Sequence, residues 1–223
     1  MSKMTPYAHA GPLKATARPW LLTALLIALV TACGGSGEVS AKSLEPRLLP
    51  ASAVPGFGLA RTLDWSDPVN LVGEGVPLAG FTHPSAGVKE FQDAHLKSAA
   101  GEILTRGAGL EVDEIHVGVA KLGSASDAVK VRGWMHGQDL QEPCVAACVF
   151  RPQPMKLSGV PDSAAVVQTV IGEPVSGPAN YRAEFTRGPY LYWVWFQGNP
   201  SETTKSRFAA GISRYYKHAK QQS

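Results

Sequence analysis

Residues 190–198, with the sequence YLYWVWFQG, constrain the fold of this chain more than any other segment. Side chains of a β-strand alternate between the two faces of a sheet. Here both faces are apolar, with Leu191, Trp193 and Trp195 on one side and Tyr192, Val194 and Phe196 on the other. Such a strand must be covered on both sides, or one of its sides must line a groove.

The segments around this strand predict further strands and a terminal helix. Residues 164–171 and 180–186 have the composition and alternation of strands, and a tight turn at 187–188 leads into residues 190–198. After that strand, capping chemistry predicts a helix whose N-cap is Asn199, with Pro200 in the first helical position and Glu202 completing a capping box. The apolar stripe of this helix is formed by Phe208, Ile212, Tyr215 and Ala219.

The first half of the chain predicts short strands and loops up to residue 83, followed by a longer helix. Ser85 would cap this helix and Gly107 would end it. Its apolar stripe at near-helical spacing is Val88, Phe91, His95, Ala99 and Ile103. A half-buried strand then follows at 115–121, and a helix capped by Ser124 runs from about Ala125 to Met135.

Two strand-to-helix junctions, 122–130 and 197–205, share a glycine, a capping residue, a serine, an acid and a lysine at equal offsets. They have two explanations, a duplicated βα unit or the same capping chemistry used twice. The order of elements predicts an α+β domain in which an antiparallel sheet has its helices packed on one face, with two related βα halves if the duplication is real.

The N-terminal segment reads as an export signal. Residues 20–30 form an apolar run that is too short for a bilayer, which needs ~20 apolar residues, and has the length of a secretory h-region. The sequence Val30-Thr31-Ala32-Cys33 resembles the bacterial lipobox, in which the cysteine is acylated, with palmitate among the expected acyl groups, and becomes the first residue of the mature chain. The alternative is an ordinary secretory signal that contains a cysteine by chance.

These features divide the chain into three parts. Residues 1–32 are predicted to be a lipoprotein signal peptide, and residues 33–56, rich in Gly, Ser, Ala and Pro, a flexible linker that carries the lipid. Residues 57–223 are expected to form a single domain. The lipid would hold this domain on the extracytoplasmic face of the cell membrane.

The net positive charge of the chain is not evidence for a nucleic-acid partner, and we expect none. The chain has 21 Lys and Arg and 18 Asp and Glu, a formal net charge of +3. Three of the basic residues, Lys3, Lys14 and Arg18, lie in the signal, so the exported chain has equal numbers of both signs. Residues 182–223 remain locally cationic, which suits either an anionic membrane surface or a solvated helix face.

The lipobox, the glycine-rich tether after it and residues 184–216 together resemble uncharacterised exported lipoproteins of actinobacteria. Some of those proteins have a domain similar to the Mog1/PsbP-like α/β sandwich. The resemblance implies a role in binding or in the cell envelope, and it carries over no catalytic residue.

Cys144 and Cys148 are the other two cysteines of the chain. In an exported protein an isolated pair usually forms a disulfide. Four residues along one strand would separate their Cα atoms by ~13 Å, so the pairing requires a compact loop, which Pro143 favours. The alternative is a copper or thiol-redox site, since soft ligands gather in this part of the chain. The residues of that alternative are Met135, His136, Cys144, Cys148 and Met155.

The aromatic strand also suggests a ligand site. An aromatic groove bordered by arginines could hold a small hydrophobic ligand, whereas the same residues could simply form the core around a central strand. The candidate residues are Tyr192, Trp193, Trp195, Arg182 and Arg187.

No motif in the sequence predicts catalysis or a cofactor. There is no GxSxG nucleophile elbow and no HxxxH or HExxH metal spacing. We therefore expect a cell-envelope lipoprotein that binds, senses or maintains the envelope without catalysis. Its expected partners are the membrane, through the lipid anchor, and a small hydrophobic ligand or another envelope protein.

Overall fold

The computed structural model describes residues 40–65, 67–75, 84–108, 111–141, 144–145, 148–171, 179–198 and 201–222. These residues belong to one compact unit, Val39–Ser223. The predicted signal peptide, its lipobox and Cys33 lie outside the described residues.

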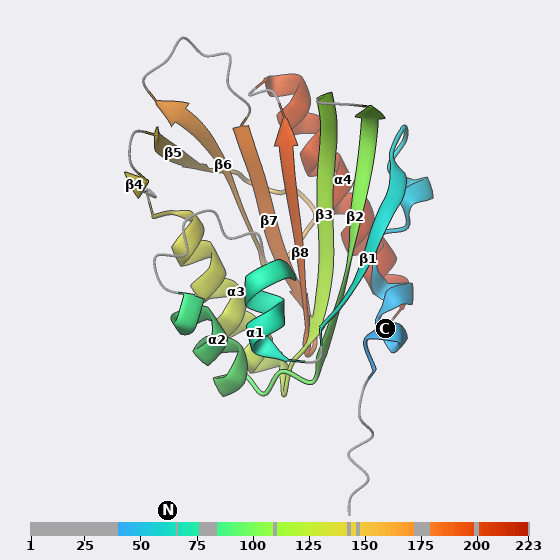
Figure 1. Cartoon of the computed structure of the whole chain (residues 1–223), viewed down its shortest axis with the longest axis vertical. Helices are drawn as coiled ribbons and strands as arrows, with labels where there is room; N and C mark the ends of the chain where they lie inside the picture. Colours follow the sequence, from blue (N-terminus) through green and yellow to red (C-terminus); the bar gives the residue numbers. More distant parts are fainter. Residues whose placement is uncertain are drawn as a thin grey trace, which may run out of the picture. The chain divides into compact units, whose positions relative to one another are not determined.

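An eight-stranded sheet in which every neighbouring pair is antiparallel forms the centre of this unit (Figure 1). The spatial order is β1-β2-β3-β8-β7-β6-β5-β4, so the chain makes two antiparallel meanders, β1–β3 and β4–β8, which meet where β8 pairs with β3. The strands are β1 Gly58–Trp65, β2 Ser98–Ala108, β3 Glu111–Lys121, β4 Cys144–Val145, β5 Cys148–Pro154, β6 Ser163–Ile171, β7 Ala179–Arg187 and β8 Tyr190–Gly198.

The helices begin where the sequence offers a cap. The Ser124 hydroxyl accepts a hydrogen bond from the Asp127 N–H, and Ser201 does the same for Thr204, so Ser201 rather than the predicted Asn199 caps the last helix. No helix among the described residues is both long and apolar enough to cross a membrane. The helical elements are η1 Ala41–Ser43, η2 Glu45–Arg47, η3 Ala51–Ala53, α1 Pro68–Asn70, the π-helical η4 Leu71–Gly75, α2 Pro84–Asp93, α3 Ala125–Asp139 and α4 Glu202–Gln221.

The predicted α+β class and antiparallel sheet are confirmed, but the helices lie on both faces of the sheet and not on one. In Figure 1, α1–α3 lie in front of the sheet and α4 lies behind it. Two separate hydrophobic clusters show the same division, because Leu191 and Trp193 of β8 pack with α2 and α3, whereas Tyr192 and Val194 pack with α4. The physical reason is that β8 is apolar on both faces, so each face requires its own cover.

The two strand-to-helix junctions therefore lead to opposite faces. The helix after β3 covers one side of the sheet and the helix after β8 covers the other. This arrangement favours repeated capping chemistry over a duplicated βα unit.

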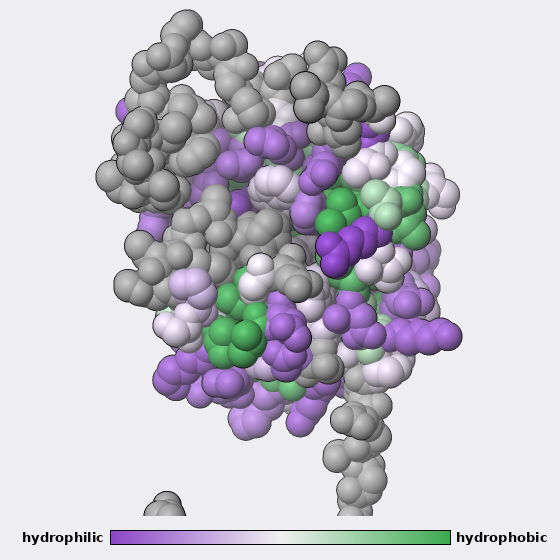
Figure 2. Space-filling model, viewed as in Figure 1, coloured by the Kyte–Doolittle hydropathy of each residue, from purple (hydrophilic) through white to green (hydrophobic). Residues whose placement is uncertain are grey.

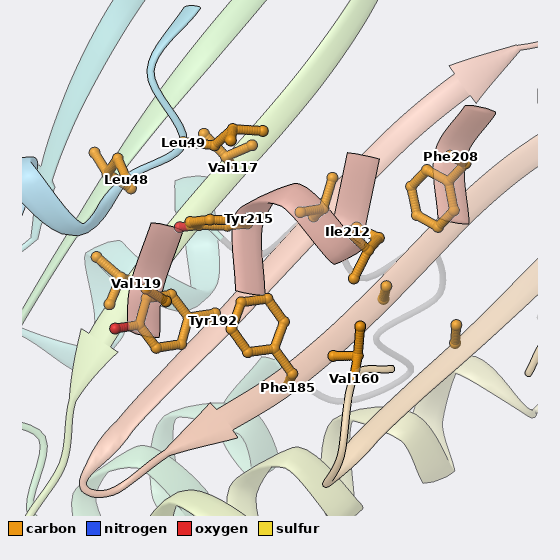
Figure 3. Close-up of a cluster of buried hydrophobic side chains, with 14 of the residues drawn as sticks. Leu48, Leu49, Val117, Val119, Val160, Phe185, Tyr192, Phe208, Ile212 and Tyr215 are labelled. Carbon is orange, nitrogen blue, oxygen red and sulfur yellow. The ribbon is translucent and has the colours of Figure 1, made fainter. Parts of the chain in front are cut away.

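The cluster on the α4 face is built around aromatic rings (Figure 3). Phe185 stacks on Tyr192 with ring centroids 4.7 Å apart, and Tyr215 of α4 meets both rings edge-on at 5.4 and 5.5 Å. The Tyr215 hydroxyl donates a hydrogen bond of 3.1 Å to the Gly118 carbonyl, so this buried polar group is satisfied.

The long helix predicted between Ser85 and Gly107 is wrong in its second half. Helix α2 ends at Asp93, His95 takes a left-handed φ of 53°, and the Leu96 N–H donates to the Phe91 carbonyl as in a helix C-cap. Residues 98–108 form β2 instead. A spacing of four residues is compatible with a strand as well as a helix, because every second residue of a strand shares a face.

A flexible linker was predicted at residues 33–56, but the structure shows that the chain packs against the sheet from residue 40 onward. Leu44 and Leu48 are buried in the α4-face cluster, at 1% and 2% exposure, together with Ala41 and Leu49. Figure 3 shows Leu48 and Leu49 beside Val117 of β3. These leucines among Pro and Ala supply enough apolar surface for the segment to pack as short 3-10 turns on the sheet.

We expect Leu44→Ala to lower the free energy of unfolding by about 2–5 kcal/mol, because it removes a fully buried side chain and leaves a cavity. Urea denaturation measures the change. Lys42→Ala is the matched control, since Lys42 is exposed in the same turn. A free linker would instead make the two variants equally stable.

Candidate functional site

The α4 face of the sheet contains a pocket of about 390 Å³. It lies between α4, the strands β2, β3 and β8, and the segment that leads into β1. Its volume is within the range of small-molecule sites. The lining residues are Leu49, Val54, Pro55, Phe57, Arg106, Ile115, Val194, Phe196, Thr204, Arg207, Phe208, Gly211, Ile212 and Arg214.

A glycine in α4 helps to leave this space open. Gly211 lines the pocket, and a Cβ placed there would meet no closer atom than Arg214 Nη2 at 4.0 Å. Glycine inside a helix lowers its stability relative to alanine. The position therefore carries a cost to the helix and leaves room between α4 and the sheet.

Three arginines border the pocket, and they differ in their pairing. Arg106 binds the Asp113 carboxylate, with 3.1 Å from Nε to Oδ2, and its guanidinium lies 4.7 Å from the centre of the Phe57 ring. Arg207 and Arg214 of α4 are exposed and make no ion pair with any residue that the structure describes. The pocket therefore combines an apolar wall with two positive charges that have no ion-pair partner in the described ranges.

The predicted aromatic groove does not form as one site. Tyr192 is fully buried on the α4 face, where Arg47 Nη1 donates to its hydroxyl at 3.4 Å, whereas Trp193 is buried on the α3 face, 6.4 Å from Trp65 between ring centroids. Alternation along β8 separates the two side chains, so they cannot line one groove. The pocket is instead lined by Val194 and Phe196 of the same strand.

Trp195 and the two predicted arginines, Arg182 and Arg187, do not line the pocket either. Trp195 is half-buried and meets the His116 ring edge-on at 4.7 Å. Arg187 is half-buried at the end of β7. Arg182 is buried, and its Nη1 donates to Asp139 Oδ1 at 2.7 Å, so its charge is used inside the fold.

This Asp139–Arg182 ion pair belongs to a buried polar cluster between α3, β6 and β7. Gln168 Nε2 donates to the Asp139 carbonyl at 2.9 Å, and Glu184 lies beside the pair. Asp139 Oδ2 and Glu184 Oε2 are both buried, and neither meets a donor within the described part of the chain. Two buried carboxylates side by side would leave both oxygens unsatisfied.

The surroundings of Glu184 favour its protonated form. Burial raises the pKa of Glu184 well above the usual range of glutamate, and the neighbouring Asp139 carboxylate raises it further, whereas Arg182 and Arg132 lower it. As a carboxylic acid, Glu184 can donate a hydrogen bond to Asp139. With Glu184 in this form, the Asp139 carboxylate and the Arg182 guanidinium would leave the three side chains without a net charge.

The five residues of the copper or redox alternative do not surround one position. Met135 is buried in the α3-face cluster and Met155 packs against the α4-face cluster, so the sheet separates them. No group of three or more His, Cys, Asp or Glu residues that could hold a metal occurs in the described ranges. Cys144 and Cys148 begin the paired strands β4 and β5 on neighbouring rungs, opposite Val149 and Val145, and their disulfide stays a prediction.

Arg182 was a predicted site residue, whereas Glu184 and the pocket residues Arg207, Gly211 and Arg214 were not. The pocket depends on Gly211, Arg207 and Arg214, which would have been visible as a 207, 211, 214 stripe beside the predicted apolar stripe of the last helix. The buried cluster depends on Arg182 and Glu184, which alternate with apolar residues along β7. Their side of the strand is covered by α3.

We expect Glu184→Gln to weaken the pH dependence of stability. A carboxyl group whose pKa is raised on folding contributes stability at low pH, and that stability is lost as the pH rises through the folded-state pKa. The wild-type free energy of unfolding should therefore fall more steeply than that of the variant as the pH rises above the usual pKa range of glutamate, because the amide of the variant does not titrate and can still donate to Asp139.

Urea denaturation across this pH series measures both slopes. Glu202→Gln is the control, because the Glu202 side chain is 87% exposed. Equal slopes for the wild type and Glu184→Gln would contradict the protonation of Glu184.

Comparison with known proteins gives a fold similarity. No family model matches the sequence, and no curated protein matches it significantly. Among solved structures, the chain is similar to the extracellular domain of PknH from Mycobacterium tuberculosis, with 16% sequence identity and a TM-score of 0.53. The similarity covers 82% of this chain and 99% of that domain, and at this identity it establishes a shared fold.

Proposed function

We propose that this chain is a non-catalytic binding module of the cell envelope and that its ligand is a small molecule with an apolar part, held in the pocket under α4. The pocket is the observation that carries the proposal. Phe196, Phe208 and Ile212 line it, although the cores of proteins are normally filled to the density of organic crystals. Apolar walls that a core leaves open are typical of ligand sites.

The chemistry of the lining favours binding over catalysis. Thr204 supplies a hydroxyl and three arginines supply guanidinium groups, whereas the described lining contains no carboxylate, imidazole or thiol. Those missing groups are the usual general acids, general bases and nucleophiles of enzymes. The guanidinium groups can hold and orient a ligand without exchanging protons near neutral pH.

Two observations support a location outside the cytoplasm. The N-terminal segment is predicted to be an export signal, and it ends in the lipobox-like Val30-Thr31-Ala32-Cys33. The fold is similar to that of an extracellular domain, that of PknH. In our proposal, acylation of Cys33 anchors the domain on the extracytoplasmic face of the membrane, where it senses or carries its ligand.

Gly211→Leu tests the pocket directly. The leucine side chain would extend into the space beside Gly211, so binding of the uncharged fluorophore N-phenyl-1-naphthylamine should weaken about tenfold or more. The same change removes a helical glycine and should leave the protein at least as stable, with a gain of up to about 1 kcal/mol. Fluorescence titration measures binding and urea denaturation measures stability.

Gly133→Leu is the matched control. Gly133 is an exposed glycine in α3 with no atom within 4 Å of its Cβ position, so this variant changes helix propensity alone. The fluorophore should bind to it as it does to the wild type. If Gly211→Leu also bound the fluorophore like the wild type, the pocket would not be the binding site.

A further inference from the structure

We propose that the ligand of the α4 pocket is an anionic amphiphile, whose single alkyl chain lies against the apolar wall and whose carboxylate or phosphate is bound by Arg207 and Arg214. This inference rests on the proposed function and names the chemical class of the ligand. Its evidence is the position and the pairing of the two guanidinium groups.

Arg207 and Arg214 lie on the same side of α4 as the open position at Gly211. Residues at i, i+4 and i+7 share a face of an α-helix, so 207, 211 and 214 form one stripe. All three residues line the pocket, and Arg214 Nη2 is the closest atom to the Cβ position of Gly211. The two arginines therefore border the space that the glycine leaves open.

The charges of these arginines are not compensated by neighbouring acids. Of the basic residues near the pocket, Arg106 is paired with Asp113, and Lys205 of α4 is paired with Glu202. Arg207 and Arg214 have no such partner in the described ranges, and the described lining includes neither Asp nor Glu. An anion at the border of the pocket would therefore gain both guanidinium groups without displacing an existing ion pair.

An apolar wall beside two guanidinium groups is complementary to an amphiphile with an anionic head group. The planar guanidinium group matches carboxylate and phosphate oxygens and binds them through two parallel hydrogen bonds. A free inorganic anion would leave the wall of Phe196, Phe208 and Ile212 in contact with water, whereas an uncharged hydrocarbon would bury that wall but leave both arginines unpaired. About 390 Å³ suits a single chain of moderate length and excludes a folded partner.

The experiment compares ligands that share one chain and differ in the head group. N-phenyl-1-naphthylamine is bound to the purified protein and displaced by decanoate, decyl phosphate, 1-decanol or inorganic phosphate. We expect the two anionic amphiphiles to displace it at concentrations about tenfold or more below that of 1-decanol, as charge-assisted hydrogen bonds add to the burial of the chain. Inorganic phosphate should not displace it, and the order of the two anions identifies the preferred head group.

The variant Arg207→Gln/Arg214→Gln should lose this preference and still bind 1-decanol. Lys217→Gln/Lys220→Gln is the matched control, because it removes the same charge from exposed positions of α4 that do not line the pocket. It should keep the preference, which separates contact with the head group from general attraction of anions.

The outcomes distinguish this inference from the proposed function. If 1-decanol competes as well as decanoate on the wild type, or if the arginine variant keeps the preference, the anionic class is overturned and the apolar pocket stands. If inorganic phosphate competes as well as decyl phosphate, the site binds free anions and the amphiphile is overturned. If neither the fluorophore nor any alkyl compound binds, the proposed function fails as well.

Discussion

Trp193 packs closely against β3 because residue 118 is a glycine. A Cβ at this position would lie 2.1 Å from the indole ring, and the carbonyl of the same residue accepts the hydrogen bond of Tyr215 from α4. One residue of β3 thus contacts the α3-face cluster and the α4-face cluster together. The central pair β3 and β8 is consequently covered on both faces, and the rest of the domain is arranged around this pair.

The two faces of the sheet differ in what lies between the strands and the helices that cover them. On the α3 face, helix and sheet close over polar groups, among them the Asp139–Arg182 ion pair and Glu184. Figure 2, which views the molecule from the side of α1–α3, shows small hydrophobic patches over α1 and beside β1, the elements that contain the exposed Val69 and Leu59. On the α4 face, a pocket remains beside Gly211, and two arginines at its border, Arg207 and Arg214, have no ion-pair partner among the residues that the structure describes. The α3 face therefore contributes stability, and we assign binding to the α4 face.

Strands with clear alternation could be predicted from the sequence, and so could the helices that start at serine caps. The sequence patterns failed where two structures share one spacing or where partners are distant in the chain. Ala99 and Ile103 are four residues apart, which suits a helix and a strand equally, and the left-handed His95 that ends α2 has no strong sequence signal. Leu44 and Leu48 stand in a Pro- and Ser-rich segment typical of linkers, and only tertiary packing makes them core residues. The groove predicted from the aromatic strand and its arginines does not form, because strand alternation places Tyr192 and Trp193 on opposite faces and Arg182 meets Asp139 across 43 positions of sequence.

Amide hydrogen exchange of the purified protein, with and without decyl phosphate, tests the central claim that the α4 face is the ligand site and the α3 face is a closed core. The account predicts slower exchange in residues 49–57 and 204–214 when the amphiphile is present, and unchanged exchange in α3. Protection confined to α3, or no change in either region at saturating ligand, would contradict it.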